Sequence, residues 1–268
     1  MVLDARTKPC WGDFEFKDEK WKRLLFPPHK LWLKMKDHLL SMVLEPESED
    51  YGPGFQPAGL VPGDFPPEDL PVSHYRTGGD GSKIAFGPRL PDRAVVVSHG
   101  DNLYVLPDEE LRAYCALPLS IALLESPSGR EIAERASRKL SKTLFGDTDN
   151  GEILYSYPKN LEFTPAPFMD KPLDAVCPIL IRNVSPERLL VKRLCVRVEF
   201  LGIYWENDKV FTDEICFSFK GEKYGSQISV HPFKGYKNSN PELIFPAKTP
   251  YSNRLIRKSF DFFRSIGQ

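Results

Sequence analysis

The stretch LLVKRLCVRVEFLGIYWENDKVFTDEICFSFK, residues 189–220, has the clearest periodicity in the chain and decides its fold class. Over residues 194–200, apolar side chains alternate with polar ones or cysteine, which is the period of two of a strand with one buried face. A polar turn follows at residues 206–209, and the alternation resumes over residues 215–220. The two segments are therefore predicted to form an antiparallel pair with one face toward water.

Length and charge limit the class of protein. The 268 residues suffice for one large all-β domain or two small ones. With 36 basic and 37 acidic side chains the net charge is -1, so no overall field attracts nucleic acid or anionic lipid. No stretch resembles a signal peptide or approaches the roughly 18 apolar residues of a membrane span. We expect a cytoplasmic protein with no transmembrane segment and no nucleic-acid partner.

The residue types that carry chemistry are scattered. The five cysteines are odd in number, widely spaced and without a C-x-x-C motif, which argues against a disulfide framework and a zinc site and predicts reduced, mostly buried thiols. No histidine lies in a metal-ligand motif, and nucleophile-elbow, dinucleotide, kinase and deaminase motifs are missing. We expect no catalytic residue, no metal and no cofactor, which favours a protein that is not an enzyme.

The N-terminal part has two interpretations. Apolar residues in the segment 21–44 recur both at helical spacing and in strand-like alternation. Pro27 and Pro28 break a helix upstream, and Asp37-His38 suit a turn. We favour a short antiparallel meander and expect residues 1–45 to pair with the main body.

A proline-rich segment follows. Residues 46–71 hold seven of the 25 prolines, so neither a helix nor a paired strand is expected to run through them. The TGGDGSK stretch at 77–83 lacks the spacing of a phosphate-binding loop and is predicted to be a turn. We expect residues 46–82 to form one long loop, either a surface connection or a proline-rich ligand for a partner.

The main body, residues 83–249, is predicted to be an antiparallel β-sandwich. Short apolar runs separated by turn residues recur about every ten residues from 83 to 124, a pattern typical of sandwiches and barrels. Residues 129–140 have the propensity of a short helix, which sheet pairing can override. The final segment, 250–268, is predicted to be an amphipathic helix that either caps the core or docks a partner.

Asn150-Gly151 predicts a tight hairpin between residues 143–145 and 153–155. Asp147 and Asp149 resemble the start of a calcium loop, but the fifth, sixth and twelfth positions do not fit an EF-hand. An acidic hairpin turn is the preferred interpretation, with a calcium-stabilised domain as a third hypothesis for the protein.

Two groups of residues are candidates for binding a ligand or partner. Trp205 and Tyr204 end a predicted strand beside a polar turn, where an aromatic ring can stack on a sugar or a side chain. The predicted hairpin contributes Phe145, Asp147, Asp149 and Glu152. Glycoside hydrolysis would need two carboxylates brought together by the fold. The candidates for that pair are Asp147, Glu152, Glu199 and Asp213.

Several phrases together resemble a known family. They are Trp11-Gly12, Leu31-Trp32-Leu33, Leu140-Ser141-Lys142-Thr143-Leu144-Phe145-Gly146 running on to Gly151-Glu152, Cys177-Pro178 with Asn183, Leu194-Cys195 with Ile203-Tyr204, and Gly221 with Ser226-Gln227. Over nearly its full length the chain resembles the uncharacterised family catalogued as domain of unknown function number 432. The resemblance implies an all-β fold and no catalytic residue. It also implies an accessory role, because members are often encoded near small mechanosensitive channels.

The function predicted first is a non-enzymatic binding or assembly module, with a protein partner or a second copy held through the C-terminal helix or the proline-rich loop. The alternative is a carbohydrate-binding or carbohydrate-active β-sandwich protein.

Overall fold

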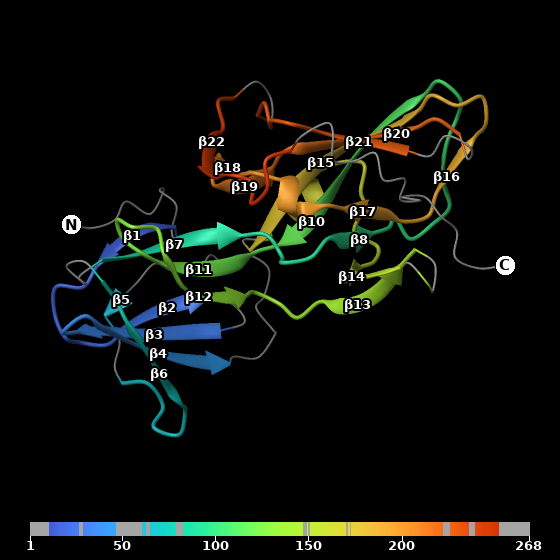
Figure 1. The fold of residues 1–268 in the computed structure, drawn as a ribbon. Coiled ribbons are helices and arrows are strands. Elements are labelled where there is room, and N and C mark those ends of the chain that lie inside the picture. The colour runs from blue at the N-terminus through green and yellow to red at the C-terminus, as the bar shows by residue number, and fades with distance from the viewer. Residues whose placement is uncertain are drawn as a thin grey trace. The chain divides into compact units, whose positions relative to one another are not determined.

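The computed structural model describes residues 11–26, 29–46, 61–62, 65–78, 83–146, 149, 151–169, 171, 173–221, 226–235 and 239–251. Within these residues the chain forms strands β1 to β22 and two single turns of 3-10 helix, which confirms the all-β prediction. It divides into two compact units (Figure 1). Unit 1 comprises Met1–Arg89, Leu119–Arg138 and Lys171–Leu173, and unit 2 comprises Leu90–Pro118, Lys139–Asp170 and Asp174–Gln268.

Unit 1 contains two antiparallel sheets. The first has the order β1-β7-β11-β12. Its strands are β1 (Gly12–Glu15), β7 (Lys83–Arg89), β11 (Ser120–Glu125) and β12 (Glu131–Ala136). The second has the order β5-β2-β3-β4-β6. Its strands are β2 (Lys22–Phe26), β3 (His29–Lys36), β4 (Leu39–Pro46), β5 (Val61–Pro62) and β6 (Val72–Arg76).

The second sheet confirms the strand interpretation of residues 21–44. Strands β2, β3 and β4 pair as successive antiparallel neighbours, with the β3–β4 turn at Asp37-His38. Both turn residues have positive φ, at 47° and 62°, as a tight hairpin requires. Part of the segment expected to be loop is also strand, because β5 pairs with β2 and β6 pairs with β4. Residues 47–60 lie outside the described residues.

The helix predicted for residues 129–140 is wrong. Six of these residues form β12, which pairs with β11 in antiparallel register, for example Ile121 opposite Arg135. The pairing buries Ala133 and supplies the backbone hydrogen bonds that a helix would have made. Helix propensity amounts to only about 0.7 kcal/mol per residue at most between ordinary residues, so tertiary pairing decides the outcome.

Unit 2 contains a seven-stranded sheet of order β21-β20-β15-β19-β18-β22, in which β10 also pairs with β15. Its members are β10 (Glu110–Pro118), β15 (Asp174–Asn183), β18 (Ile203–Glu206), β19 (Lys209–Thr212), β20 (Glu214–Phe219), β21 (Ser226–His231) and β22 (Glu242–Phe245). Strand β15 is antiparallel to β10 but parallel to β19 and β20. The expectation of purely antiparallel sheets is therefore wrong.

Two smaller sheets complete unit 2. One has the order β13-β14-β8-β17 and the other pairs β16 with β9. Their strands are β8 (Val95–Val97), β9 (Leu103–Val105), β13 (Ser141–Phe145), β14 (Glu152–Tyr157), β16 (Leu189–Val191) and β17 (Leu194–Val196). Two 3-10 turns, η1 (Ala166–Phe168) and η2 (Val198–Phe200), lie between strands. Antiparallel pairing of β13 and β14 confirms that these segments form a hairpin, but Phe145 lies opposite Glu152, so residues 146–151 join the strands in place of the tight turn predicted at Asn150-Gly151.

The antiparallel pair predicted for residues 194–200 and 215–220 is wrong. Strand β17 pairs with β8, whereas β20 lies in the seven-stranded sheet. The strand β17 ends at Val196, before turn η2. It is buried along its whole length, so it has no solvent-exposed face. The polar turn at Asn207-Asp208 instead joins β18 to β19, with φ of 48° and 62° at its two residues.

Two further predictions meet the structure only in part. Cys115, Cys177, Cys195 and Cys216 are free and buried, which confirms the interpretation of the described cysteines as reduced core residues. The predicted C-terminal helix is not seen, because residues 252–268 lie outside the described residues. Sandwich packing of the sheets stays a prediction.

Candidate functional site

The sequence-predicted binding residues fall into two groups. Tyr204 and Trp205 lie on β18 in the seven-stranded sheet, whereas Phe145 and Glu152 face each other on the β13–β14 hairpin of a different sheet. Asp149 is exposed beyond that hairpin, and Asp147 lies outside the described residues. The structure therefore offers two separate candidate sites.

At the first candidate site, Tyr204 and Trp205 do not form a common platform. Successive side chains of a strand point to opposite faces of its sheet. Tyr204 packs into an aromatic cluster, with its ring 5.8 Å from that of Phe233, which in turn stacks on Phe211 at 4.6 Å. Trp205 is half-buried on the other face. The two rings therefore contribute to packing on opposite faces of the sheet and do not form one surface on which a sugar could stack.

Asp213, one of the candidate carboxylates, is engaged by the fold. It is 8 % exposed, and its Oδ2 accepts the backbone N–H of Gly202 at 2.7 Å. Its Oδ1 accepts the N–H of Phe233 at 3.3 Å. Burial, together with a hydrogen bond to Asp213, raises the pKa of Tyr204 to about 12, so this hydroxyl stays protonated and donates to the carboxylate. The Asp213 carboxylate accepts three hydrogen bonds and so connects β18 and the loop after β21 to the junction between β19 and β20.

Of the other candidate carboxylates, Glu152 is engaged by an arginine. Arg197 donates from Nη1 and Nη2 to Glu152 Oε1 and Oε2, at 3.0 and 2.7 Å. Glu152 and Asp213 lie in different sheets, and Glu199 follows β17 in turn η2. A glycosidase needs one carboxyl group able to act as an acid beside a second one, whereas both carboxylate oxygens of Glu152 accept hydrogen bonds from Arg197.

Two Ser–His contacts also fall short of a catalytic group. Ser41 Oγ lies 3.0 Å from His74 Nδ1 across β4 and β6, and Ser229 Oγ lies 3.0 Å from His231 Nε2 within β21. A nucleophile of this kind needs a third group that orients the histidine. Neither histidine has such a contact with a carboxylate in the part of the chain that the structure describes. Among all residues that the structure describes, no group of three or more His, Cys, Asp or Glu side chains could hold a metal ion.

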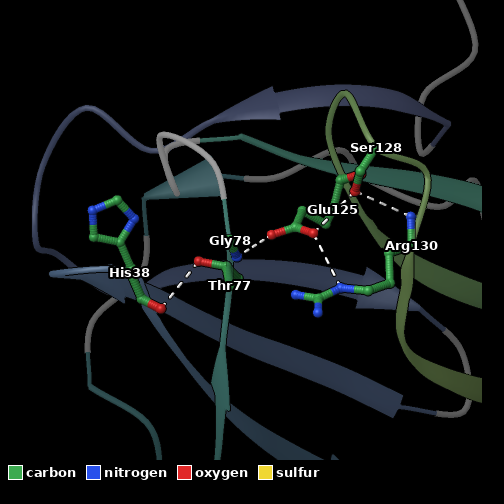
Figure 2. A network of polar contacts seen from close by, with 6 residues as sticks. All are labelled: His38, Thr77, Gly78, Glu125, Ser128 and Arg130. Carbon is green, nitrogen blue, oxygen red and sulfur yellow. Dashed lines mark hydrogen bonds and ion pairs between the residues drawn. The ribbon is translucent and has the colours of Figure 1, made fainter.

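A polar network around Glu125 connects the two sheets of unit 1 (Figure 2). Glu125 ends β11 and is 7 % exposed, and its carboxylate accepts the backbone N–H of Gly78, just beyond β6. Ser128 Oγ donates to its Oε2 at 2.9 Å, and Arg130 Nε lies 3.1 Å from the same oxygen. A Cβ at Gly78 would lie 3.1 Å from the carboxylate, which explains glycine at that position.

The network continues to the β3–β4 turn. Thr77 donates from both its backbone N–H and its Oγ1 to the carbonyl oxygen of His38, at 2.8 and 3.0 Å. Figure 2 shows the two halves meeting at the Thr77-Gly78 backbone. Among these contacts the Gly78–Glu125 bond joins the two sheets, while Thr77–His38 lies within the second sheet and Ser128 and Arg130 lie between β11 and β12, so the network ties the end of β6 to the end of β11.

This network predicts a pH dependence of stability. The Ser128 hydrogen bond, with those from Gly78 and Arg130, holds the pKa of Glu125 below its usual value. A carboxyl group with a lowered folded-state pKa stabilises the fold above its unfolded-state pKa, and this contribution is lost as the pH falls through the folded-state value. We expect urea midpoints of the wild type to fall from pH 5 toward pH 3 more steeply than those of Glu125→Gln. Glu68→Gln, at an exposed site of the same unit, is the control and should keep the wild-type slope; equal slopes for all three proteins would contradict the prediction.

The second candidate site is the outer edge of the β13–β14 hairpin. Strand β13 ends its sheet, and no described strand pairs with its other side (Figure 1). Leu144 and Ile153 lie directly opposite each other and are 38 % and 54 % exposed. Two large apolar side chains thus form an exposed pair beside an open row of backbone N–H and C=O groups.

Basic side chains surround this edge. Lys139 and Lys142 are exposed and form no ion pair with any residue that the structure describes. The guanidinium of Arg193 lies 5.4 Å from the centre of the Phe145 ring, and its Nη1 lies 3.5 Å from Thr143 Oγ1. We call Lys139, Lys142, Leu144, Ile153 and Arg193 the β13 surface.

Other outer strands lack this combination. In unit 2, Tyr251 donates its hydroxyl to the carbonyl oxygen of Ile228 on β21, at 2.7 Å, and so covers part of that edge. Strand β22 exposes Leu243, whose cross-strand neighbour Tyr204 packs into the aromatic cluster. In unit 1, exposed Val72 on β6 faces the fully buried Val43. Among these edges, β13 alone pairs two exposed apolar residues.

Sequence reasoning located this hairpin but missed the residues that make its surface. Phe145 was a candidate, yet it is buried, while its neighbour Leu144 is exposed. The run Thr143-Leu144-Phe145 places apolar residues on both faces, so alternation could not tell which face is covered. The predicted hairpin, with Lys142 on its first strand, was the available signal.

A comparison with family models gives one match: the model described as "Protein of unknown function (DUF432)" covers residues 10–264. No curated protein and no solved structure matches the chain. No helix within the described ranges is long and apolar enough to cross a membrane.

Proposed function

We propose that this chain, which belongs to the DUF432 family of proteins of unknown function, is a non-enzymatic binding module that receives an extended partner segment on the outer edge of β13. The observation that carries the proposal is the exposed Leu144–Ile153 pair beside an open strand edge. A cytoplasmic location, and further contacts through the proline-rich loop or the C-terminal segment, remain predictions.

Strand addition explains why these features occur together. In this binding mode, backbone hydrogen bonds along the edge supply affinity, and contacts to alternate side chains supply specificity. An added strand lies within about 5 Å of β13, which brings its side chains against Leu144. The lysine on β13 also discourages uncontrolled pairing of the open edge, as charged residues on outer strands commonly do.

Two of the candidate carboxylates are engaged within the fold, which favours a binding role. Glu152 is held by Arg197, and Asp213 is held by backbone N–H groups and Tyr204. Glu152 and Asp213, two of the carboxylates offered for hydrolysis, thus stabilise the fold. The carbohydrate alternative gains no specific support from the arrangement.

Selection from a displayed library of random twelve-residue peptides tests the proposal. The wild-type protein should enrich binders, and Leu144→Asp should weaken their binding at least about tenfold, because it places a charge in the apolar contact. Leu243→Asp is the matched control, since Leu243 is 51 % exposed on another outer strand of the same unit. The Leu243→Asp protein should bind the selected peptides as tightly as the wild type does.

Amide hydrogen exchange supplies the second readout. Strand addition should slow exchange of β13 amides when a selected peptide is bound, since its backbone then pairs with that edge. Failure to enrich any peptide, or equal binding to wild type and Leu144→Asp, would overturn the proposal.

A further inference from the structure

We infer that the segment bound by β13 is acidic and apolar, with two adjacent carboxylate residues next to one apolar residue. This inference rests on the proposed function and adds the chemistry of the partner. It follows from the charges around β13 and from the alternation of its side chains.

The local charge is positive although the whole chain is nearly neutral. Lys142 lies on β13 and Lys139 just before it, while Arg193, from the loop before β17, reaches Thr143 over one face of the sheet; none forms an ion pair with the residues that the structure describes. On the hairpin, Glu152 is held by two nitrogens of Arg197, and the connecting loop carries the exposed Asp149, so the three cations still outnumber the free carboxylate that is described there. A partner that approaches this edge therefore meets uncompensated cations.

Alternation along β13 assigns a preference to each position of an added strand. Lys142 and Leu144 point to one face, together with Ile153, while Thr143 points to the other face, where Arg193 contacts it. On an added strand, an acidic residue beside Lys142 would pair with that lysine, and an acidic residue beside Thr143 would pair with Arg193. The residue beside Leu144 would be apolar. Opposite charges and apolar pairs in such neighbouring positions stabilise a sheet.

The order of these three residues depends on strand direction. A parallel partner would read acid-acid-apolar, and an antiparallel partner would read apolar-acid-acid. Nucleic acid is the weaker candidate, because three cations beside an apolar pair suit a peptide better than a chain of phosphates.

Fluorescence anisotropy with labelled synthetic peptides tests the inference. The probes are Ser-Thr-Glu-Asp-Val-Thr-Ser, its reversed sequence, and counterparts in which Lys-Arg replaces Glu-Asp. One acidic peptide should bind at least about tenfold more tightly than its basic counterpart, and the preference should shrink as salt rises. A labelled single-stranded oligonucleotide should bind no better than the basic peptides.

Charge reversal then locates the preference. Lys142→Glu should weaken binding of the acidic peptide about fivefold to tenfold and strengthen that of its basic counterpart. Lys248→Glu, at an exposed lysine outside the β13 surface, should leave both affinities unchanged.

The outcomes separate the inference from the proposed function. Equal binding of acidic and basic peptides, both lost in Leu144→Asp, would overturn the acidic preference and keep strand addition. Tighter binding of the oligonucleotide than of any peptide would overturn the peptide as the ligand. No binding of any probe would overturn the acidic inference, and an empty library selection would in addition overturn the proposed function.

Discussion

Replacing Asp213 by alanine is expected to lower the free energy of unfolding by about 3–4 kcal/mol, because a buried carboxylate that satisfies several donors is removed. The N–H groups of Gly202 and Phe233 and the hydroxyl of Tyr204 would lose their acceptor together. Gly202 is itself buried, so water does not readily replace the lost bond.

Urea unfolding measures this effect. Circular dichroism and tryptophan fluorescence should be followed together, because the chain has two compact units and one free energy is meaningful only if the transitions coincide. Asp213→Asn should give an intermediate loss, since one amide oxygen still accepts. Exposed Asp101→Ala should change stability by less than about 0.5 kcal/mol. A loss below about 1 kcal/mol for Asp213→Ala would contradict the assigned role.

Asn183→Ala is expected to destabilise the protein by about 3 kcal/mol, because four hydrogen bonds to one fully buried side chain are lost. Asn183 is 0 % exposed, and its Nδ2 donates to the carbonyl oxygens of Val105 and Glu187, at 3.0 and 2.7 Å. Its Oδ1 accepts the N–H and Oγ of Ser185, at 3.1 and 2.7 Å. One amide thus holds β9, the end of β15 and the loop before β16 together.

Two further variants separate the hydrogen bonds from side-chain volume. Asn183→Asp should be at least as destabilising at pH 7, since a buried negative charge would face two carbonyl oxygens. Exposed Asn102→Ala is the control and should be nearly neutral. The same urea titrations measure all three, and a stable Asn183→Asp protein would show that donation to Val105 and Glu187 contributes little.

The elements that sequence reasoning predicted well share a local cause. The β3–β4 turn combines residues suited to a tight turn with flanking strand formers, and the β13–β14 hairpin joins two neighbouring strand-forming segments through a longer loop, so nearby residues suffice to specify both. Parallel pairing of β15 with β19 and β20 joins segments that lie far apart in the chain. Nothing in a local pattern identifies such partners.

Local signals also failed where tertiary contacts opposed them. Residues 131–136 favour a helix alone but form β12, because β11 offers a pairing partner. Residues 194–200 alternate like a strand with one wet face, yet β17 is buried throughout and stops at Val196. The partner of β12 is the neighbouring strand β11, whereas β17 pairs with β8, which lies about a hundred residues earlier in the chain.

The candidate site also combines features that the sequence predicted with features that only the structure shows. Sequence patterns drew attention to the hairpin through Phe145 and Glu152, but the structure places Phe145 in the core and holds Glu152 on Arg197. Exposure of Leu144 and Ile153 depends on which face of the sheet is covered, and an open edge depends on where the sheet ends. Both are properties of the assembled sheet.

The sequence by itself determined the all-β class, the tight β3–β4 turn, the pairing of β13 with β14, the reduced state of the described cysteines and the lack of catalytic motifs, because period, turn residues and motif spacing are local. Only the tertiary structure decided which strands pair, which carboxylates are engaged, and that β13 carries an exposed apolar pair among cations. The physical reason is that burial and backbone pairing are satisfied by residues far apart in the chain, so they exist only once the sheets have formed.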